Sequence, residues 1–300
     1  MSAFTAINLD KLPAPEIVDR KAFETILAEV KAWLIGREPT LEPVLALESE
    51  PLSKVLEAWA YREMLVRAEV DDAARGNMLA FATGAQLDHL ATFYGVERQV
   101  VQEADEDAVP PVPEILEDDA RFRQRVQLAP EGMTTAGSRG SYVFWGLAAS
   151  PKVKDIDVAS DTPGEVQITV LSTEGDGTAD APLLAAVSAQ LNDDEVRPVC
   201  DTVDVQAATI TAYTLEAALT LYEGPDSEVV RQAAEDAVTA YVIDHHRLGH
   251  DITVSGLHAA LHQVGVQNVT LTSPAADIIV AASEAAHCTS VTVSVGGYDV

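Results

Sequence analysis

The apolar positions between residues 83 and 98 recur with the period of an α-helix. One face of that helix would carry the residues at i, i+3, i+4 and i+7, which are Leu87, Leu90, Ala91 and Tyr94. Gly95 follows where a left-handed residue ends a helix, and Val96 where a Schellman motif places an apolar contact. Thr83 and Gln86 have the spacing of a capping box. The pattern predicts a short helix with a defined start and end that packs on one face.

Two longer helices are predicted before this one. The first spans Asp19 to Ile35 and has one apolar stripe, formed by Phe23, Ile26, Leu27, Val30 and Leu34. The second begins at Pro51 after the capping residue Ser49, and its apolar positions include Leu52, Val55, Leu56, Trp59 and Leu65. Met1 to Pro15 has no such period and is typical of an extended tail. We therefore expect residues 1–100 to form an N-terminal helical arm or bundle.

Residues 101–120 differ from the rest of the chain in charge and proline content. Acidic residues crowd between Glu103 and Asp119 with no basic residue among them, around Pro110, Pro111 and Pro113. Charge repulsion and proline stiffness predict an acidic, proline-rich linker. Three arginines follow it directly: Arg121, Arg123 and Arg125. They could pair with the acidic stretch or with a neighbouring subunit, but a solvated helix start is the interpretation we favour.

From Gly137 onward the pattern is mixed and indicates the α+β class. A first module at 121–208 is expected to hold helix 141–149, strands 153–158 and 164–171, helix 182–191 and strand 202–206. A second module at 209–300 is expected to hold strand 211–222, helix 227–245, strand 251–254, helix 255–264, strand 266–271 and edge strands 277–281 and 290–295. A similar order near 141–171 and 255–281 favours two small mixed α/β modules related by internal duplication.

The composition limits what such a chain does. A formal net charge of −29 disfavours binding to phosphate backbones and to anionic membranes. Met1 to Val30 lacks a signal-peptide pattern, and no run approaches the roughly 20 apolar residues that span a bilayer. We therefore expect synthesis and assembly in a cytoplasm. Cys200 and Cys288 are isolated and are expected to be buried, as are the helical tryptophans, Trp33, Trp59 and Trp145.

Histidines supply the strongest candidate chemistry. His245, His246 and His250 lie close together, and His258 and His262 are one helical turn apart. The residues between the latter pair lack the glutamate of a zinc hydrolase motif, so a metal-dependent enzyme is only an alternative interpretation. The sequence contains no phosphate-binding glycine loop and no nucleophile elbow. We assign no catalytic, cofactor-binding or metal-binding residue and expect no enzymatic activity.

The helix considered first also carries a family motif. Its spelling, Gly84-x-x-Leu87-Asp88-x-Leu90-Ala91-x-x-Tyr94-Gly95-Val96-x-Arg98, resembles that of the baseplate J-like family of contractile phage tails. Further segments between residues 65 and 280 resemble the same family in the same order. They are Ala136–Ser138 with Tyr142, Val153–Val158, Pro163–Val166, Gly175–Gly177, Arg197–Val205, Leu248–Ile252 and Gly265–Val269. The strong acidity of 103–119 departs from the family pattern.

The resemblance implies a structural component of the baseplate wedge, similar to the wedge protein of large contractile phages. Such a protein forms the inner ring around the hub through dimer and ring contacts, and its modules rearrange when the tail contracts. The implied partners are other copies, the sheath-initiating wedge protein and the tail-fibre-side wedge protein, with no nucleic acid, membrane or cofactor. The implied location is the virion tail baseplate. A generic acidic scaffold protein is the remaining alternative, and phage, bacteriocin and other injection devices stay equally open.

Overall fold

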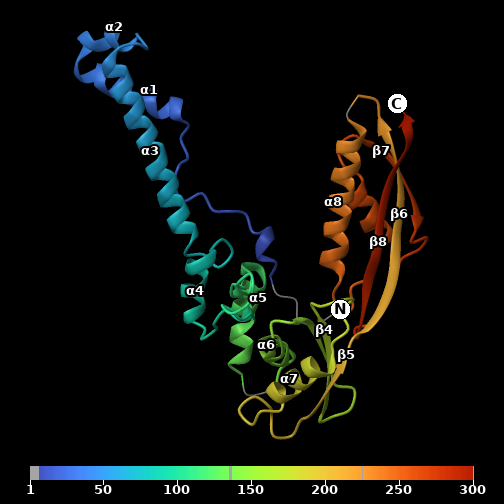
Figure 1. Cartoon of the computed structure of the whole chain (residues 1–300). Coiled ribbons are helices and arrows are strands. Elements are labelled where there is room, and N and C mark those ends of the chain that lie inside the picture. Colours follow the sequence, from blue (N-terminus) through green and yellow to red (C-terminus); the bar gives the residue numbers. More distant parts are fainter. Residues whose placement is uncertain (1–6, 135–136, 225, 300) are drawn as a thin grey trace. The chain divides into compact units, whose positions relative to one another are not determined.

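The computed structural model describes residues 7–134, 137–224 and 226–299. Ala136 of the family motif and residues 1–6 of the expected tail lie outside these ranges. The chain divides into two compact units, a first unit formed by Ile7–Glu97 and a second unit whose main body is Arg98–Val300. N-terminal helices are followed by small sheets with helices of their own, which confirms the predicted α+β class (Figure 1).

The first unit is helical. Its elements are the short 3-10 helices Leu9–Lys11 and Pro39–Leu41, then α1 (Phe23–Arg37), α2 (Glu42–Leu45), α3 (Pro51–Arg75) and α4 (Gly84–Thr92). α1 packs along α3, where the buried side chains of α3 are short: Ser53, Ala60 and Asp71. Asp71 accepts a hydrogen bond of 2.8 Å from Nε of Arg20 and forms an ion pair of 3.1 Å with Arg75. This buried carboxylate therefore fixes the segment before α1 onto α3.

α4 ends as the sequence predicts. Gly95 has φ +66°, and its N–H donates to Thr92 O while that of Val96 donates to Ala91 O, each over 3.2 Å. These two bonds form the predicted Schellman motif, and Val96 is buried. The predicted capping box is wrong, because the side chain of Thr83 makes no capping hydrogen bond. The amide of Gln86 lies over Gly76 instead, within 2.4 Å of where a Cβ would stand.

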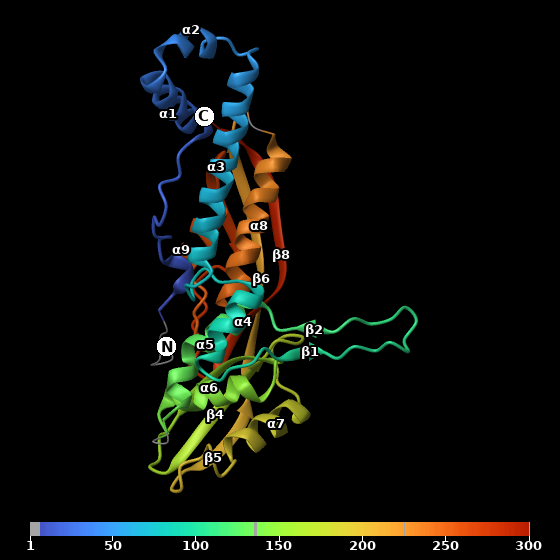
Figure 2. The same cartoon turned by 90° about the vertical axis from the view of Figure 1, so that its left-hand side faces the viewer.

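The segment that we expect to be a linker has secondary structure of its own. β1 (Val100–Gln102) and β2 (Ile115–Leu116) pair antiparallel, and Asp105 and Val112 exchange two hydrogen bonds of 2.9 Å farther out. We call residues 100–116 the hairpin arm; it extends away from the modules of its unit (Figure 2). Most of its side chains are exposed, including all of its acidic residues.

The first module holds α5 (Asp119–Gly132), α6 (Arg139–Ala149), β3 (Val153–Ala159), β4 (Glu165–Ser172), α7 (Ala181–Leu191) and β5 (Thr202–Ala207). Its strand order is β3-β4-β5, with β3 antiparallel and β5 parallel to the central strand. α6 packs on β3, and its buried face meets the side chain of Ile156. Asp118, Ser138 and Asp180 cap α5, α6 and α7 by accepting backbone N–H bonds at the helix starts.

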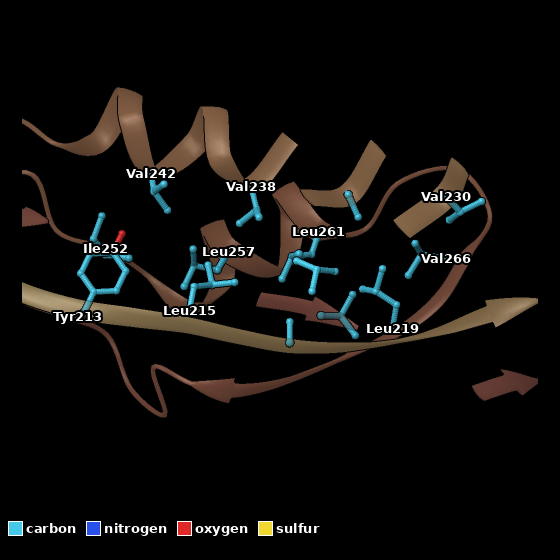
Figure 3. Packing of buried hydrophobic residues seen from close by; sticks show 14 of the residues in the cluster. Tyr213, Leu215, Leu219, Val230, Val238, Val242, Ile252, Leu257, Leu261 and Val266 are labelled. Carbon is cyan, nitrogen blue, oxygen red and sulfur yellow. The ribbon is translucent and has the colours of Figure 1, made fainter. Parts of the chain in front are cut away.

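The second module holds β6 (Thr209–Tyr222), α8 (Ser227–His245), α9 (Val254–Leu261), β7 (Val266–Ser273) and β8 (Glu284–Asp299), in the strand order β7-β6-β8. Side chains of β6 alternate between buried and more exposed positions from Tyr213 to Leu221. The buried ones, such as Leu215 and Leu219, face Val238 of α8 and Leu257 of α9 (Figure 3). Each fully buried leucine contributes about 1.5–3 kcal/mol, so this layer holds the module together.

Two predicted strands of the second module are reduced to a single bridge. Residues 251–254 and 277–281 pair through their backbones at one bridge, where Ile252 and Ile278 exchange hydrogen bonds of 3.0 and 2.9 Å. On either side, carboxylates take the backbone donors that a longer ladder would use. Asp251 accepts from the N–H of Val280 over 2.9 Å, and Asp277 accepts from that of Val254 over 2.7 Å. β8 is longer than predicted because it pairs along the whole length of β6.

The two modules share a sheet arrangement but not a chain order. In each, the central strand has one antiparallel and one parallel neighbour. The central strand comes between its two neighbours in the first module and before both in the second. Among the described helices, none combines the length and the hydropathy that crossing a bilayer requires.

Candidate docking face and structural joints

A buried ion-pair network fastens the base of the hairpin arm. Glu117 follows β2 and is fully shielded, and its Oε2 accepts from Nη1 of Arg125 over 2.6 Å. Its Oε1 pairs with Nη1 of Arg121. Arg121 also donates to the carbonyl oxygens of Leu147, Ser150 and Val153 over 2.9–3.4 Å. One carboxylate and two guanidiniums thus tie the arm, α5, α6 and β3 together.

The favoured prediction of a solvated helix start is wrong for Arg121 and Arg125. Both point inward, and burial lowers the pKa of Arg121 from its usual value despite the neighbouring carboxylate of Glu117. Removing such charges from water is unfavourable unless they are paired, and Glu117, which directly follows the arm, is buried with them. The alternative of pairing with the acidic stretch is therefore the correct one, through Glu117.

Arg98, the last residue of the first family motif, belongs to the same base. Its guanidinium donates to the carbonyl oxygen of Glu117 over 2.6 Å and to Oδ1 of Asp119 over 2.8 Å. It also lies 4.6 Å above the ring of Phe122, within cation–π range. The motif thus ends in a residue that joins the two ends of the hairpin arm to α5.

Motif residues far apart in sequence meet inside the first module. Tyr142 Oη donates to Oδ2 of Asp201 over 2.7 Å, and burial raises the pKa of this tyrosine above its usual value. Gly137 has φ +68°, and a Cβ there would lie 2.5 Å from the ring of Pro198. Glycine is required at this point both by backbone conformation and by space. These residues pack the start of α6 against the segment before β5.

A joint connects the two modules of the second unit. Oδ2 of Asp155, on β3, accepts from the N–H of Leu248 over 3.1 Å, and its Oδ1 accepts from Ile156 over 2.9 Å. Burial raises the pKa of this carboxyl from its usual value. A small apolar cluster lies at the same joint: Leu171, Ala208, Leu248 and Ala285. We call Asp155 with this cluster the module joint.

The candidate histidines lie around the joint, α8 and α9, and the ring centroids of His245 and His250 are 6.1 Å apart. His246 is buried, its Nδ1 lies 2.8 Å from Ala286 O, and burial lowers its pKa. His245 stacks on Tyr241 with ring centroids 3.9 Å apart. His258 is half-buried on α9 and His262 is exposed after it. Within the described ranges, no three histidine, cysteine or carboxylate side chains are grouped to hold a metal ion.

An exposed apolar face runs along α3. Val55, Trp59, Val66 and Val70 are between 47% and 62% exposed, and at 3.6 residues per turn they lie within about 60° of arc. They point away from the short buried side chains that pack on α1. We call these four residues the α3 face. The prediction that Trp33 and Trp59 are buried is therefore wrong, as it is for the exposed Cys200, whereas Trp145 is half-buried.

Three family models match the chain in order. They are the Baseplate J-like N-terminal domain at residues 48–105, the Baseplate J-like central domain at residues 134–207 and the Baseplate J-like protein C-terminal domain at residues 213–294. Baseplate protein J of Escherichia phage P2 is 46% identical to this chain over 298 residues, covering 98% of this chain and 99% of that protein. The match therefore extends across both proteins.

Solved structures also resemble the chain. One of them is the cryo-EM structure of the anti-feeding prophage baseplate, of which one chain matches with 12% identity and a TM-score of 0.39. The match covers 61% of this chain and 44% of that chain, so this protein spans less than half of it.

The motif residues described above form packing joints, which is the arrangement of a multi-module structural protein. With three successive domain matches and a relative of 46% identity along nearly its whole length, the chain belongs to the baseplate J-like family.

Proposed function

We propose that the chain is a structural component of the baseplate wedge of a contractile tail or tail-like particle. The observation that carries this proposal is the match to a named baseplate protein over nearly the whole of both chains. The α3 face supports it, because an apolar helix face left open in one chain is typical of a protein that is completed by assembly.

The same proposal covers the partners. Copies of the chain form dimers that close into an inner ring around the hub. The sheath-initiating and tail-fibre-side wedge proteins bind each subunit. The helical first unit supplies contacts to wedge partners, and the α+β modules supply contacts within the ring. Of the divisions at residues 1–100, 101–120, 121–208 and 209–300, the N-terminal helical part and the two α+β modules are the ones that move relative to one another when the tail contracts.

The joints support this mechanical role. The module joint is small and contains a buried carboxylate without an ion-pair partner among the described residues, so its stability is limited. The base of the hairpin arm, by contrast, is closed by several charged hydrogen bonds. We infer that the arm stays fixed to the first module, whereas the two modules are able to pivot. The chain acts through these contacts and has no hydrolase activity.

The test is localisation in particles. The gene is deleted from a tail-producing strain and replaced by an epitope-tagged copy, and the particles are imaged with gold-labelled antibody. Label confined to the baseplate, and loss of complete tails in the deletion, are expected. Label on the tube, the sheath or no part of the particle contradicts the proposal. Light scattering of the purified chain tests the oligomer separately, because a monomer at every concentration contradicts dimer and ring contacts.

A further inference from the structure

The ring of His246 lies between the two modules of the second unit. His246 directly follows α8 of the second module and is only 8% exposed. Gly177 lies across the joint, in the turn after β4 of the first module, and a Cβ on this glycine would stand 2.7 Å from Nε2 of the ring. The ring therefore fills the space that a glycine leaves open, and it packs against a module to which its own helix does not belong.

The hydrogen bonding of His246 fixes which ring nitrogen carries the proton at neutral pH. Nδ1 lies 2.8 Å from the carbonyl oxygen of Ala286 on β8. Because a carbonyl oxygen only accepts, Nδ1 is the protonated nitrogen of the neutral ring and donates to it. Nε2 is then the nitrogen without a proton, and it is the one that faces Gly177. A second proton must enter at Nε2, on the side of the first module.

Three titratable side chains face the ring of His246 from the elements packed around it. They are Lys154 of β3, Asp176 of the turn after β4 and His287 of β8, whose ring centroid lies 5.1 Å from that of His246. Burial has the largest effect and lowers the pKa of His246 below 6.5, and the charges of Lys154 and His287 lower it further. The bond to Ala286 and the exposed carboxylate of Asp176 only partly oppose this shift.

The other charged groups of the joint are engaged elsewhere. Asp244 and Arg247, on the same segment as His246, form an exposed ion pair of 2.8 Å. His250 faces this pair and the carboxylate of Asp155. In the part of the chain that the structure describes, Nδ1 is the ring nitrogen of His246 that is hydrogen-bonded. The closed joint therefore accommodates the neutral ring and supplies no acceptor for a proton on Nε2.

Opening the joint changes the surroundings of Nε2. When the first module turns away from the end of α8, water reaches this nitrogen and hydrates the imidazolium. Protons therefore bind more tightly to the open form than to the closed form, and a falling pH shifts the equilibrium toward opening. The stability that the neutral ring gives the closed joint is fully present above about pH 6.5. It is lost as the pH falls from there through the lower pKa of the closed form.

We propose that His246 is a proton-sensitive contact that controls the pivot between the two modules. Its neutral ring holds the first module against the end of α8, and protonation at Nε2 frees that module to turn. This inference rests on the pivot in the proposed function, and it adds the residue and the chemical signal that control it.

Hydrogen exchange at two adjacent amides tests the proposal. The N–H of Leu248 donates across the joint to Asp155 over 3.1 Å, whereas that of Gly249 donates to Glu284 O inside the second module over 2.9 Å. Exchange of single amides in the full chain is followed by NMR from about pH 7.5 to about pH 5.5 and expressed as protection factors, which remove the intrinsic pH dependence. Below about pH 6.5 we expect the protection factor of Leu248 to fall by up to about tenfold per pH unit, and that of Gly249 to stay constant.

Variants that do not titrate identify the group responsible. In His246→Asn the side-chain amide can still donate to the carbonyl oxygen of Ala286, so we expect protection of Leu248 at neutral pH and no fall on acidification. His246→Gln is a second variant without a titrating ring, with the same expected result. His258→Asn, at a half-buried histidine of α9, is the matched control and should show the wild-type fall.

The outcomes separate the contact from the pivot. A protection factor of Leu248 that is lower than that of Gly249 but constant with pH overturns the inference and leaves the pivot standing. A fall that persists in both His246 variants, or a pKa of the His246 ring at or above 6.5 by NMR titration of the wild type, also overturns it. Equal protection of the two amides at every pH rejects the pivot together with the contact. The place of the chain in the baseplate is decided separately, by the labelling of particles.

Discussion

Glu117 and Arg125 are joined by a hydrogen bond of 2.6 Å although both side chains are almost completely shielded from water. They lie on either side of the N-cap of α5, so this bond sets how the hairpin arm leaves the first module. Breaking a buried pair by removing one partner costs about 3–5 kcal/mol, because the remaining charge is left without compensation. The pair is therefore a point where the second unit is sensitive to a single substitution.

We expect Glu117→Gln to lower the free energy of unfolding of the second unit by about 3–5 kcal/mol. Urea unfolding of the full chain, followed by hydrogen exchange to distinguish the units, measures the change. Glu114→Gln, on an exposed residue of the same arm, is the matched control and should change stability by less than about 0.5 kcal/mol. Equal effects of the two substitutions would show that the network does not stabilise the arm.

Gly132 and Gly36 differ in the space available to a side chain. A Cβ on Gly132 would meet the ring of Phe144 at 2.2 Å, whereas one on Gly36 would meet nothing within 4 Å. We expect Gly132→Ala to destabilise the second unit by about 1–3 kcal/mol. Gly36→Ala, near the end of α1, should stabilise the first unit by about 0.5–1 kcal/mol. Thermal unfolding measures both, and a destabilising Gly36→Ala would contradict the open space described around it.

Substitutions at the two ends of α4 are expected to differ in how much stability they cost. Gly95→Ala places a Cβ at φ +66° and is expected to cost about 1–2 kcal/mol. Thr83→Ala should cost less than about 0.5 kcal/mol, since the threonine side chain makes no capping bond. Chemical denaturation of the full chain measures both changes. A larger loss of stability for Thr83→Ala than for Gly95→Ala would contradict the absence of a capping hydrogen bond at Thr83.

Asp155 makes the stability of the module joint depend on pH. Burial raises the pKa of Asp155 in the folded chain above 3.8. The folded chain therefore binds this proton more tightly than the unfolded chain does. The contribution of Asp155 to the free energy of unfolding is fully present below pH 3.8. It is lost as the pH rises through the pKa of the folded chain. Relative to Asp155→Asn, which does not titrate, the wild type should therefore gain stability as the pH falls through this window.

Asp176 is the control for this pH dependence. A hydrogen bond from the backbone N–H of Thr178 lowers its pKa, so its contribution is present above pH 3.8 and is lost as the pH falls through the folded pKa. Wild type compared with Asp176→Asn should therefore lose stability on acidification, the opposite sign from Asp155. Denaturation curves at a series of pH values measure both differences. The same sign for both residues would contradict the burial of Asp155.

Structural features that depend on residues close together along the chain were predictable from the sequence. The end of α4 depends on Gly95 and Val96, and both act within one turn of the helix they terminate. The long strand of the second module is marked by alternation along β6, which depends only on side-chain period. The bridge between Ile252 and Ile278 was predicted as two strands, because the pattern does not reveal that Asp251 and Asp277 take the backbone donors.

The sequence by itself determined the helical and strand periods, the α+β class and the family, because these depend on local order and on motif spelling. The tertiary structure decided which apolar stripes are buried by other parts of the chain. An apolar stripe looks the same whether or not the chain folds over it, so the exposure of Trp59 had no sequence signal. The bond from Leu248 to Asp155 joins residues 93 positions apart. Such pairs arise only when separately folded layers pack together, and this is why the joints and the α3 face emerged from the structure alone.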